Sequence, residues 1–131
     1  MSKSYGNTIA LFEDEKVLKK KVMGIMTDST PVEAPKDPEG SSIVALYKLF
    51  ASSADVVAME ADFRAGGIGY GEFKKRLLGA ILEYTSGFRA RRMALEAEPG
   101  VAERVLKHGA ERARVVARRT MERVRSAVGL R

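Results

Sequence analysis

The sequence predicts an all-α fold in the form of a helical bundle. Apolar residues recur at the three- and four-residue spacing of one helix face, no run reads convincingly as a strand, and clusters of proline, glycine and serine separate the periodic stretches. The chain has 131 residues, of which 45% are hydrophobic and 31% are charged. This length and composition are typical of one soluble globular domain.

The first expected helix runs from Asp14 to Met26, and its buried face is expected to consist of Leu18, Val22, Ile25 and Met26. We interpret the lysine run Lys19–Lys21 as a solvated flank of this helix. Pro31, Pro35 and Pro38 make the following stretch irregular, so we expect a tether or surface loop there.

Two shorter helices are expected next. Ser42 is placed to cap a helix that ends near Phe50 and buries one face. A further helix begins at Ser53 and stops at Gly66. The expected faces are Ile43, Leu46, Tyr47 and Phe50 in the first, and Val56, Val57, Glu60 and Phe63 in the second.

The glycines of Gly66–Gly71 resemble a nucleotide-binding loop in composition only. A dinucleotide fingerprint follows a strand, and a phosphate-binding P-loop continues with Gly-Lys-Ser/Thr; this stretch follows a helix and continues with Glu72. We interpret its glycines as a helix end and the turn into the next helix.

Two long helices complete the expected fold. One runs from Gly71 to about Ala97, and the other begins at Pro99, since proline suits the first turn of a helix. Each has an apolar line expected to face a core. The lines are Phe73, Leu77, Ala80, Ile81, Tyr84, Phe88 and Leu95 in the first, and Ala102, Val105, Gly109, Ala113, Val116, Thr120, Val124 and Ala127 in the second.

The excess charge lies at the end of the chain. Residues 1–98 contain 14 Lys/Arg and 14 Asp/Glu, whereas residues 99–131 contain nine and three, so the whole net charge of +6 belongs to the last segment. This asymmetry indicates an anionic partner, most often a nucleic acid, but an arginine-rich solvated helix face explains it equally well.

The composition excludes several kinds of site. There is no cysteine and His108 is the only histidine, so thiolate sites, histidine clusters and a Ser-His-Asp triad are excluded, and we expect no metal site. The longest apolar run near the start, Ile9–Phe12, is too short for a signal peptide or a membrane span. We therefore expect a cytoplasmic protein without a membrane partner.

The opening residues carry the chemistry. Lys3 lies between the hydroxyls of Ser2 and Ser4, followed by the turn-forming Tyr5–Gly6–Asn7. Met1–Ser4 is similar to the last four residues of the KMSKS signature of class I aminoacyl-tRNA synthetases. Met26–Ser29, Gly69–Lys74 and His108–Ala113 then follow in the order and spacing of the bacterial tryptophanyl-tRNA synthetase family, so the resemblance extends along the whole chain.

The resemblance implies a C-terminal fragment of such an enzyme. Residues 1–13 correspond to the signature loop left from an α/β catalytic domain, and residues 14–131 to a helical domain that binds the tRNA anticodon. The parent, a homodimer, uses ATP with Mg²⁺ to activate tryptophan and charge its cognate tRNA. The rest of the active site belongs to the missing N-terminal catalytic domain, so we expect the isolated chain to be inactive and to bind no cofactor.

By the same resemblance, Lys3 is the catalytic residue, and Met1, Ser2, Lys3 and Ser4 contact ATP. Negative charge builds on the pyrophosphate leaving group, and a lysine on a mobile loop neutralises it in the transition state. Residues Met1–Thr8 lack their packing partner and are expected to be mobile. The tRNA contacts are assigned by charge only, to Arg89, Arg91, Arg92, Arg104, Lys107, Arg112, Arg118 and Arg119.

Two other functions are compatible with the sequence. One is a free-standing basic helical module that binds RNA phosphates through its arginines. The other is a helical adaptor domain whose basic face only keeps it soluble. The gene sequence upstream of Met1 distinguishes both from a synthetase fragment.

Overall fold

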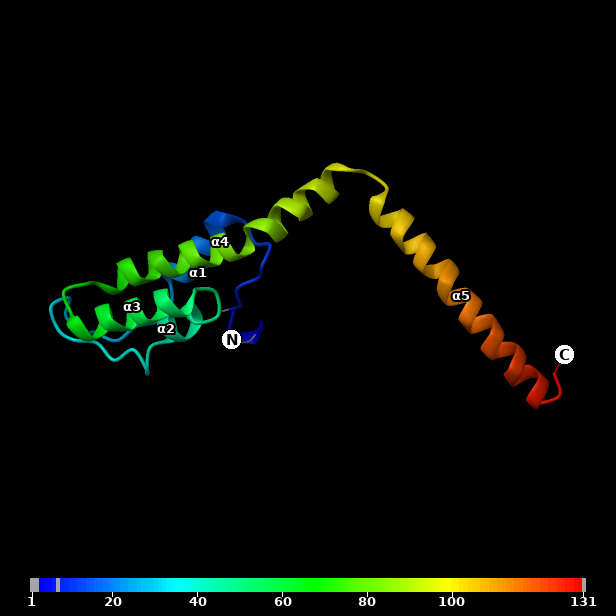
Figure 1. Ribbon diagram of the computed structural model, residues 1–131, viewed down its shortest axis with the longest axis horizontal. Coiled ribbons are helices and arrows are strands. Elements are labelled where there is room, and N and C mark those ends of the chain that lie inside the picture. The colour runs from blue at the N-terminus through cyan, green and yellow to red at the C-terminus, as the bar shows by residue number, and fades with distance from the viewer. Residues whose placement is uncertain (1–2, 7, 131) are drawn as a thin grey trace. The chain divides into compact units, whose positions relative to one another are not determined.

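The computed structural model describes residues 3–6 and 8–130, which form helices without any strand (Figure 1). A short 3-10 helix, η1 (Lys3–Tyr5), is followed by α1 (Glu15–Met23), α2 (Ser42–Tyr47), α3 (Ser53–Ala65), α4 (Tyr70–Ala97) and α5 (Val101–Ala127). The all-α prediction is confirmed. Within the described residues, no helix combines the length and apolar character needed to cross a membrane. The chain forms two compact units, Met1–Arg89 and Ala90–Arg131, whose boundary falls inside α4.

The first unit is held together by α1, α2, α3 and the first half of α4, which lie together in Figure 1. Phe63 of α3 and Phe73 of α4 are both buried in this core, with their ring centroids 4.0 Å apart. The buried apolar side chains are Leu18, Val22, Ile43, Val44, Met59, Phe63, Phe73, Leu77 and Ile81. Burial of such side chains contributes about 1.5–3 kcal/mol each, so this core supplies the main stabilisation of the unit.

α1 is shorter than the sequence predicts because both of its ends are capped. The Asp14 carboxylate accepts a hydrogen bond from the Lys16 amide at 2.8 Å, which satisfies a free donor of the first turn. At the other end, Lys74 Nζ of α4 donates to the Met23 carbonyl at 3.1 Å. Met26 therefore lies beyond the helix and is 89% exposed, contrary to the expected core position.

The proline-containing loop is packed on α3 and is not a tether. The backbone amide of Lys36 donates to the Phe63 carbonyl at 2.8 Å. The Lys36 side chain is buried, and its Nζ donates to three loop carbonyls at 3.0–3.1 Å, those of Pro31, Val32 and Ala34. These carbonyls replace the water that a buried ammonium group loses, so the loop is fixed against the end of α3.

The glycines after α3 have the structural role predicted from the sequence. Gly66 ends α3 with φ 74° and ψ −171°, and a Cβ atom there would lie 2.5 Å from the Glu33 carbonyl oxygen. Gly67 also has a positive φ, 81°, and its amide donates to the Val32 carbonyl at 2.8 Å. Only glycine permits this backbone and this close approach of the loop.

The buried faces of α3 and α4 differ in part from the predicted ones. α3 buries Met59, whereas Val57 is 66% exposed. The buried residues of α4 are Phe73, Leu77, Ile81 and Thr85, while Tyr84 and Phe88 are more than half exposed. The core-facing line of α4 thus repeats at every fourth residue and becomes polar at Thr85.

The second unit contains the end of α4 and all of α5. Gly100 precedes α5 with φ 85°, and Arg104 pairs with Glu98 at 2.6 Å across this turn. None of the described residues of α5 is buried. Its predicted apolar line is exposed, with Val105 at 66% and Val116 at 68% exposure, contrary to the expected core-facing role.

Candidate functional site

The signature segment begins the described chain. Lys3 lies in η1, and Ser4, Tyr5 and Gly6 are exposed. Met1 and Ser2 of the expected signature, and Asn7 that follows it, lie outside the described residues. Gly6 has φ 64° and nothing within 4 Å of the position of a Cβ atom, so the chain turns there in open space.

The segment after the signature, which we call the strap (residues 8–13), is attached to two helices. Lys21 Nζ of α1 donates to the Thr8 carbonyl at 2.7 Å and forms an ion pair with the Glu13 carboxylate. Arg89 Nη1 of α4 donates to the Glu13 carbonyl at 2.9 Å. Thr8 therefore has a partner, contrary to the expectation that Met1–Thr8 has none.

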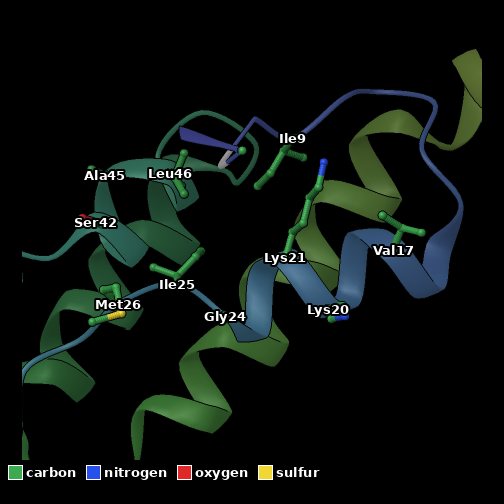
Figure 2. Close-up of a pocket in the computed structure, with 11 residues that line it drawn as sticks. Ile9, Val17, Lys20, Lys21, Gly24, Ile25, Met26, Ser42, Ala45 and Leu46 are labelled. Carbon is green, nitrogen blue, oxygen red and sulfur yellow. The ribbon is translucent and has the colours of Figure 1, made fainter. Parts of the chain in front are cut away.

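A hollow of about 860 Å³ lies beside the signature segment. Gly6 and Ile9 form its wall on the N-terminal side, and Figure 2 shows Lys21 extending from α1 toward the segment that carries Ile9. The other lining residues are Val17, Lys20, Gly24, Ile25, Met26, Ser42, Ala45 and Leu46. The walls are mainly apolar, with the two lysines as the charged groups.

Two of the sequence motifs of the resemblance lie in contact. Asp28, from Met26–Ser29, accepts hydrogen bonds from the Thr30 amide at 2.9 Å and from the hydroxyl of Tyr70, at the start of α4, at 2.7 Å. Hydrogen bonds from Thr30 and then Tyr70 lower the pKa of Asp28, and burial raises that of Tyr70. These contacts hold the segment that follows α1 against the first residue of α4. A smaller hollow of about 270 Å³ lies beside them.

The basic residues that were assigned to tRNA by charge differ in whether they have partners within the described structure. The Arg89 guanidinium is engaged inside the first unit, with Nε donating to Thr85 Oγ1 at 3.1 Å and Nη1 to Glu13. Arg92 pairs with Glu96 and Arg104 with Glu98, both at 2.6 Å. The remaining candidates are exposed and form no ion pair with the described residues: Arg91, Lys107, Arg112, Arg118 and Arg119.

On α5 the basic residues fall into two rows because of the helical spacing. One row contains Lys107, Arg114, Arg118 and Arg125, and the other contains Arg112, Arg119 and Arg123. The helix therefore presents two lines of basic residues along its length.

Sequence reasoning missed the attachment of the strap. The Lys19–Lys21 run was interpreted as solvated, yet Lys21 holds Thr8 and Glu13. One signal was present: Thr85 and Arg89 continue the four-residue spacing of the buried line of α4. Polar residues on a core-facing line indicate a buried polar partner.

The helical arrangement and the signature segment have counterparts among known proteins. Residues 1–84 match the family described as tRNA synthetases class I (W and Y). The chain belongs to this family. The predicted family resemblance is thereby confirmed.

Relatives of this class I synthetase chain align along all of it. It is 47% identical over 131 residues to the tryptophan–tRNA ligase of Rhodopirellula baltica and 42% identical over 130 residues to that of Fusobacterium nucleatum. These alignments cover 100% and 99% of the chain but only 41% and 40% of the relatives, so the chain spans about two fifths of their length.

A solved structure shares the fold of this class I synthetase chain. The crystal structure of tryptophanyl-tRNA synthetase from Campylobacter jejuni, complexed with ADP and tryptophan, matches it with a TM-score of 0.93 at 38% identity. The match covers 99% of this chain and 41% of that one.

Proposed function

We propose that this chain is the C-terminal part of a tryptophan–tRNA ligase, which uses ATP and Mg²⁺ to activate tryptophan and charge its cognate tRNA. The observation that carries the proposal is the match to tryptophan–tRNA ligases along the whole chain, at up to 47% identity. Residues 1–13 are the signature loop and residues 14–131 the tRNA-binding domain. The parent is a cytoplasmic homodimer, and its N-terminal catalytic domain supplies the tryptophan pocket and most of the ATP site.

Lys3 is the residue of this chain that acts in the reaction. When tryptophan attacks the α-phosphate of ATP, the bond to pyrophosphate breaks and negative charge accumulates on the leaving group. The Lys3 ammonium group neutralises that charge, while Met1, Ser2 and Ser4 contact the phosphates through backbone and hydroxyl donors. Because the charge grows in the transition state, this contact accelerates the step more than it tightens ATP binding.

The tRNA-binding role rests on the second unit. Its exposed basic residues, with the rows on α5, supply contacts to phosphates, which release counterions and give salt-sensitive affinity. The set comprises Arg91, Arg92, Arg104, Lys107, Arg112, Arg118 and Arg119. Arg89 is left out of it, because its guanidinium already bonds Thr85 and Glu13.

The catalytic proposal is tested by tryptophan-dependent exchange between pyrophosphate and ATP. The protein expressed from the complete gene is expected to catalyse the exchange, and the 131-residue chain alone is not. In the complete protein, Lys3→Ala is expected to slow adenylate formation about 10²–10³-fold, as for one well-placed charge donor. Lys19→Ala, which removes an exposed lysine, is the control. Exchange by the isolated chain, or an unchanged rate in Lys3→Ala, contradicts the proposal.

The RNA proposal is tested by titrating the chain with the cognate anticodon stem-loop and an unrelated one at two salt concentrations. We expect weak binding with a modest preference for the cognate loop. Replacing Lys107 and Arg118 by alanine is compared with replacing Arg112 and Arg119. Each lost phosphate contact lowers the salt slope by about 0.7–0.9, and unequal losses identify the row that faces RNA. Equal binding of both loops favours the free-standing RNA-binding module, and binding of neither removes the RNA role.

A further inference from the structure

The core-facing line of α4 ends in a polar cluster beneath the strap. Leu77 and Ile81 are followed at the same spacing by Thr85, which is 1% exposed, and then by Arg89. Thr85 Oγ1 donates to the Ile81 carbonyl at 2.7 Å and accepts from Arg89 Nε at 3.1 Å. The Thr85 hydroxyl thereby orients the guanidinium toward the strap.

The strap is held from both sides by cationic donors. Arg89 Nη1 bonds the Glu13 carbonyl at 2.9 Å across 76 positions of sequence. Lys21 bonds the Thr8 carbonyl at 2.7 Å and pairs with the Glu13 carboxylate. Thr8 Oγ1, Glu13 Oε2 and Arg89 Nη2 are also buried, and no hydrogen-bond partner for them lies among the described residues. The cluster is thus partly shielded from water, with the Lys21 and Glu13 side chains 30% and 19% exposed, and partial burial strengthens charge-assisted hydrogen bonds relative to a fully exposed surface.

Apolar burial is only one part of what positions the strap. Leu11 and Phe12, the large apolar residues at its centre, are 52% and 44% exposed. Ile9 is the strap residue that packs partly against the core. The polar contacts at Thr8 and Glu13 therefore hold the two ends of the strap, and the backbone of Gly6, two residues before it, has φ 64°.

We propose that Arg89 and Lys21 are positioning residues for the signature lysine, because they fix the strap on α4 and α1 as the rigid base from which the signature segment extends. This inference rests on the proposed function. A fixed base confines Lys3 to a small volume near the leaving phosphate, whereas a loose strap spreads it over a larger one and lowers its effective concentration.

The first test measures amide hydrogen exchange of the 131-residue chain. Arg89→Met removes the bond to Glu13, and Lys75→Met removes an exposed cation of the same helix as a matched control. Loss of one hydrogen bond to a charged group is expected to speed exchange in residues 9–13 by about tenfold or more. Exchange in α3 is expected to stay unchanged, which shows that the core is folded. Unchanged exchange in the strap overturns the inference.

The second test measures tryptophan-dependent exchange between pyrophosphate and ATP in the complete protein. Arg89→Met and, separately, Lys21→Met are expected to lower kcat by about tenfold and to leave KM for tryptophan unchanged, because displacement of a catalytic group by about 1 Å is costly. Arg89→Lys is expected to restore part of the rate, since its ammonium group retains one donor for Glu13, and Lys75→Met is expected to match the unmodified protein.

The outcomes separate the two proposals. A normal kcat in Arg89→Met, with a loosened strap and an active unmodified protein, shows that the contact is only structural and overturns the positioning role alone. An unmodified complete protein that lacks the exchange activity overturns the proposed function, and the positioning role with it.

Discussion

Substituting alanine at Gly66 and Gly67 separates backbone strain from steric clash at the end of α3. Both glycines have positive φ, 74° and 81°, but a Cβ at Gly67 would meet nothing within 4 Å. Gly67→Ala is therefore expected to lower the free energy of unfolding only by the cost of a left-handed backbone conformation, about 1–2 kcal/mol. Gly66 also has ψ −171°, a region used essentially by glycine that costs other residues about 1–3 kcal/mol.

Gly66→Ala adds a clash that flexible side chains cannot relieve. Its Cβ would lie 2.5 Å from the Glu33 carbonyl oxygen and 3.0 Å from the Ala34 carbonyl carbon, which are both backbone atoms. The loop must move away, which weakens the bond from the Lys36 amide to the Phe63 carbonyl at a cost of about 1 kcal/mol. We expect Gly66→Ala to cost about 2–4 kcal/mol in total.

The assay is urea unfolding followed by tyrosine fluorescence. All four tyrosines lie in the first unit, so the signal reports on the unit that contains both glycines. A lower midpoint with an unchanged slope indicates a loss of stability alone. Equal costs for the two variants would refute the clash argument.

Two further predictions concern the first unit. Met59→Ala is expected to lower the free energy of unfolding by about 2–5 kcal/mol because Met59 is buried, whereas Val57→Ala at a 66% exposed position is expected to change it by about 0.5 kcal/mol or less, both by urea unfolding. Lys48→Met is expected to raise the pKa of Glu60 in a carboxyl NMR titration, because the hydrogen bond from Lys48 is the main cause that lowers it. The pKa of Glu60 is lower in the folded state than its ordinary value of 4.5, so the ionised carboxylate stabilises the folded state at pH values above 4.5. This contribution is lost as the pH falls through the pKa that Glu60 has in the folded state. The variant is expected to lose less stability than the unmodified chain over that interval; an unchanged Glu60 titration would contradict the prediction.

The order and type of the helices were predictable from local patterns. Proline and glycine at the loops, and apolar residues at helical spacing, depend on conformational preferences that act within a few residues. The cap of α2 was displaced by one position, since Ser41 and not Ser42 precedes this helix, whereas α3 begins at Ser53 as predicted. Of the candidate site, Lys3 and its neighbours could be proposed from the sequence because a signature is a contiguous string.

The pairing of distant groups was not predictable in the same way. A lysine run beside an apolar stripe has the same appearance whether it faces water or a carbonyl group. Lys21 is bonded to the strap and Lys36 is enclosed by its own loop because of where the rest of the chain lies. Arg89 likewise has the side chain of a typical phosphate ligand. Only its neighbours in space show that its guanidinium is already hydrogen-bonded to Thr85 and Glu13.

Local sequence thus specified the helices, the glycine turn after α3 and the charge of α5, because each depends on residue type and spacing along one segment. The tertiary structure decided that Met59 and not Val57 is buried, that the proline loop is packed, and that Arg89 and Lys21 hold the strap. The physical reason is that burial and hydrogen bonding depend on which groups meet in space, and a buried donor takes the acceptor that the fold brings to it. Several faces of a helix can satisfy the same spacing rule, and the contacts with other helices select one of them.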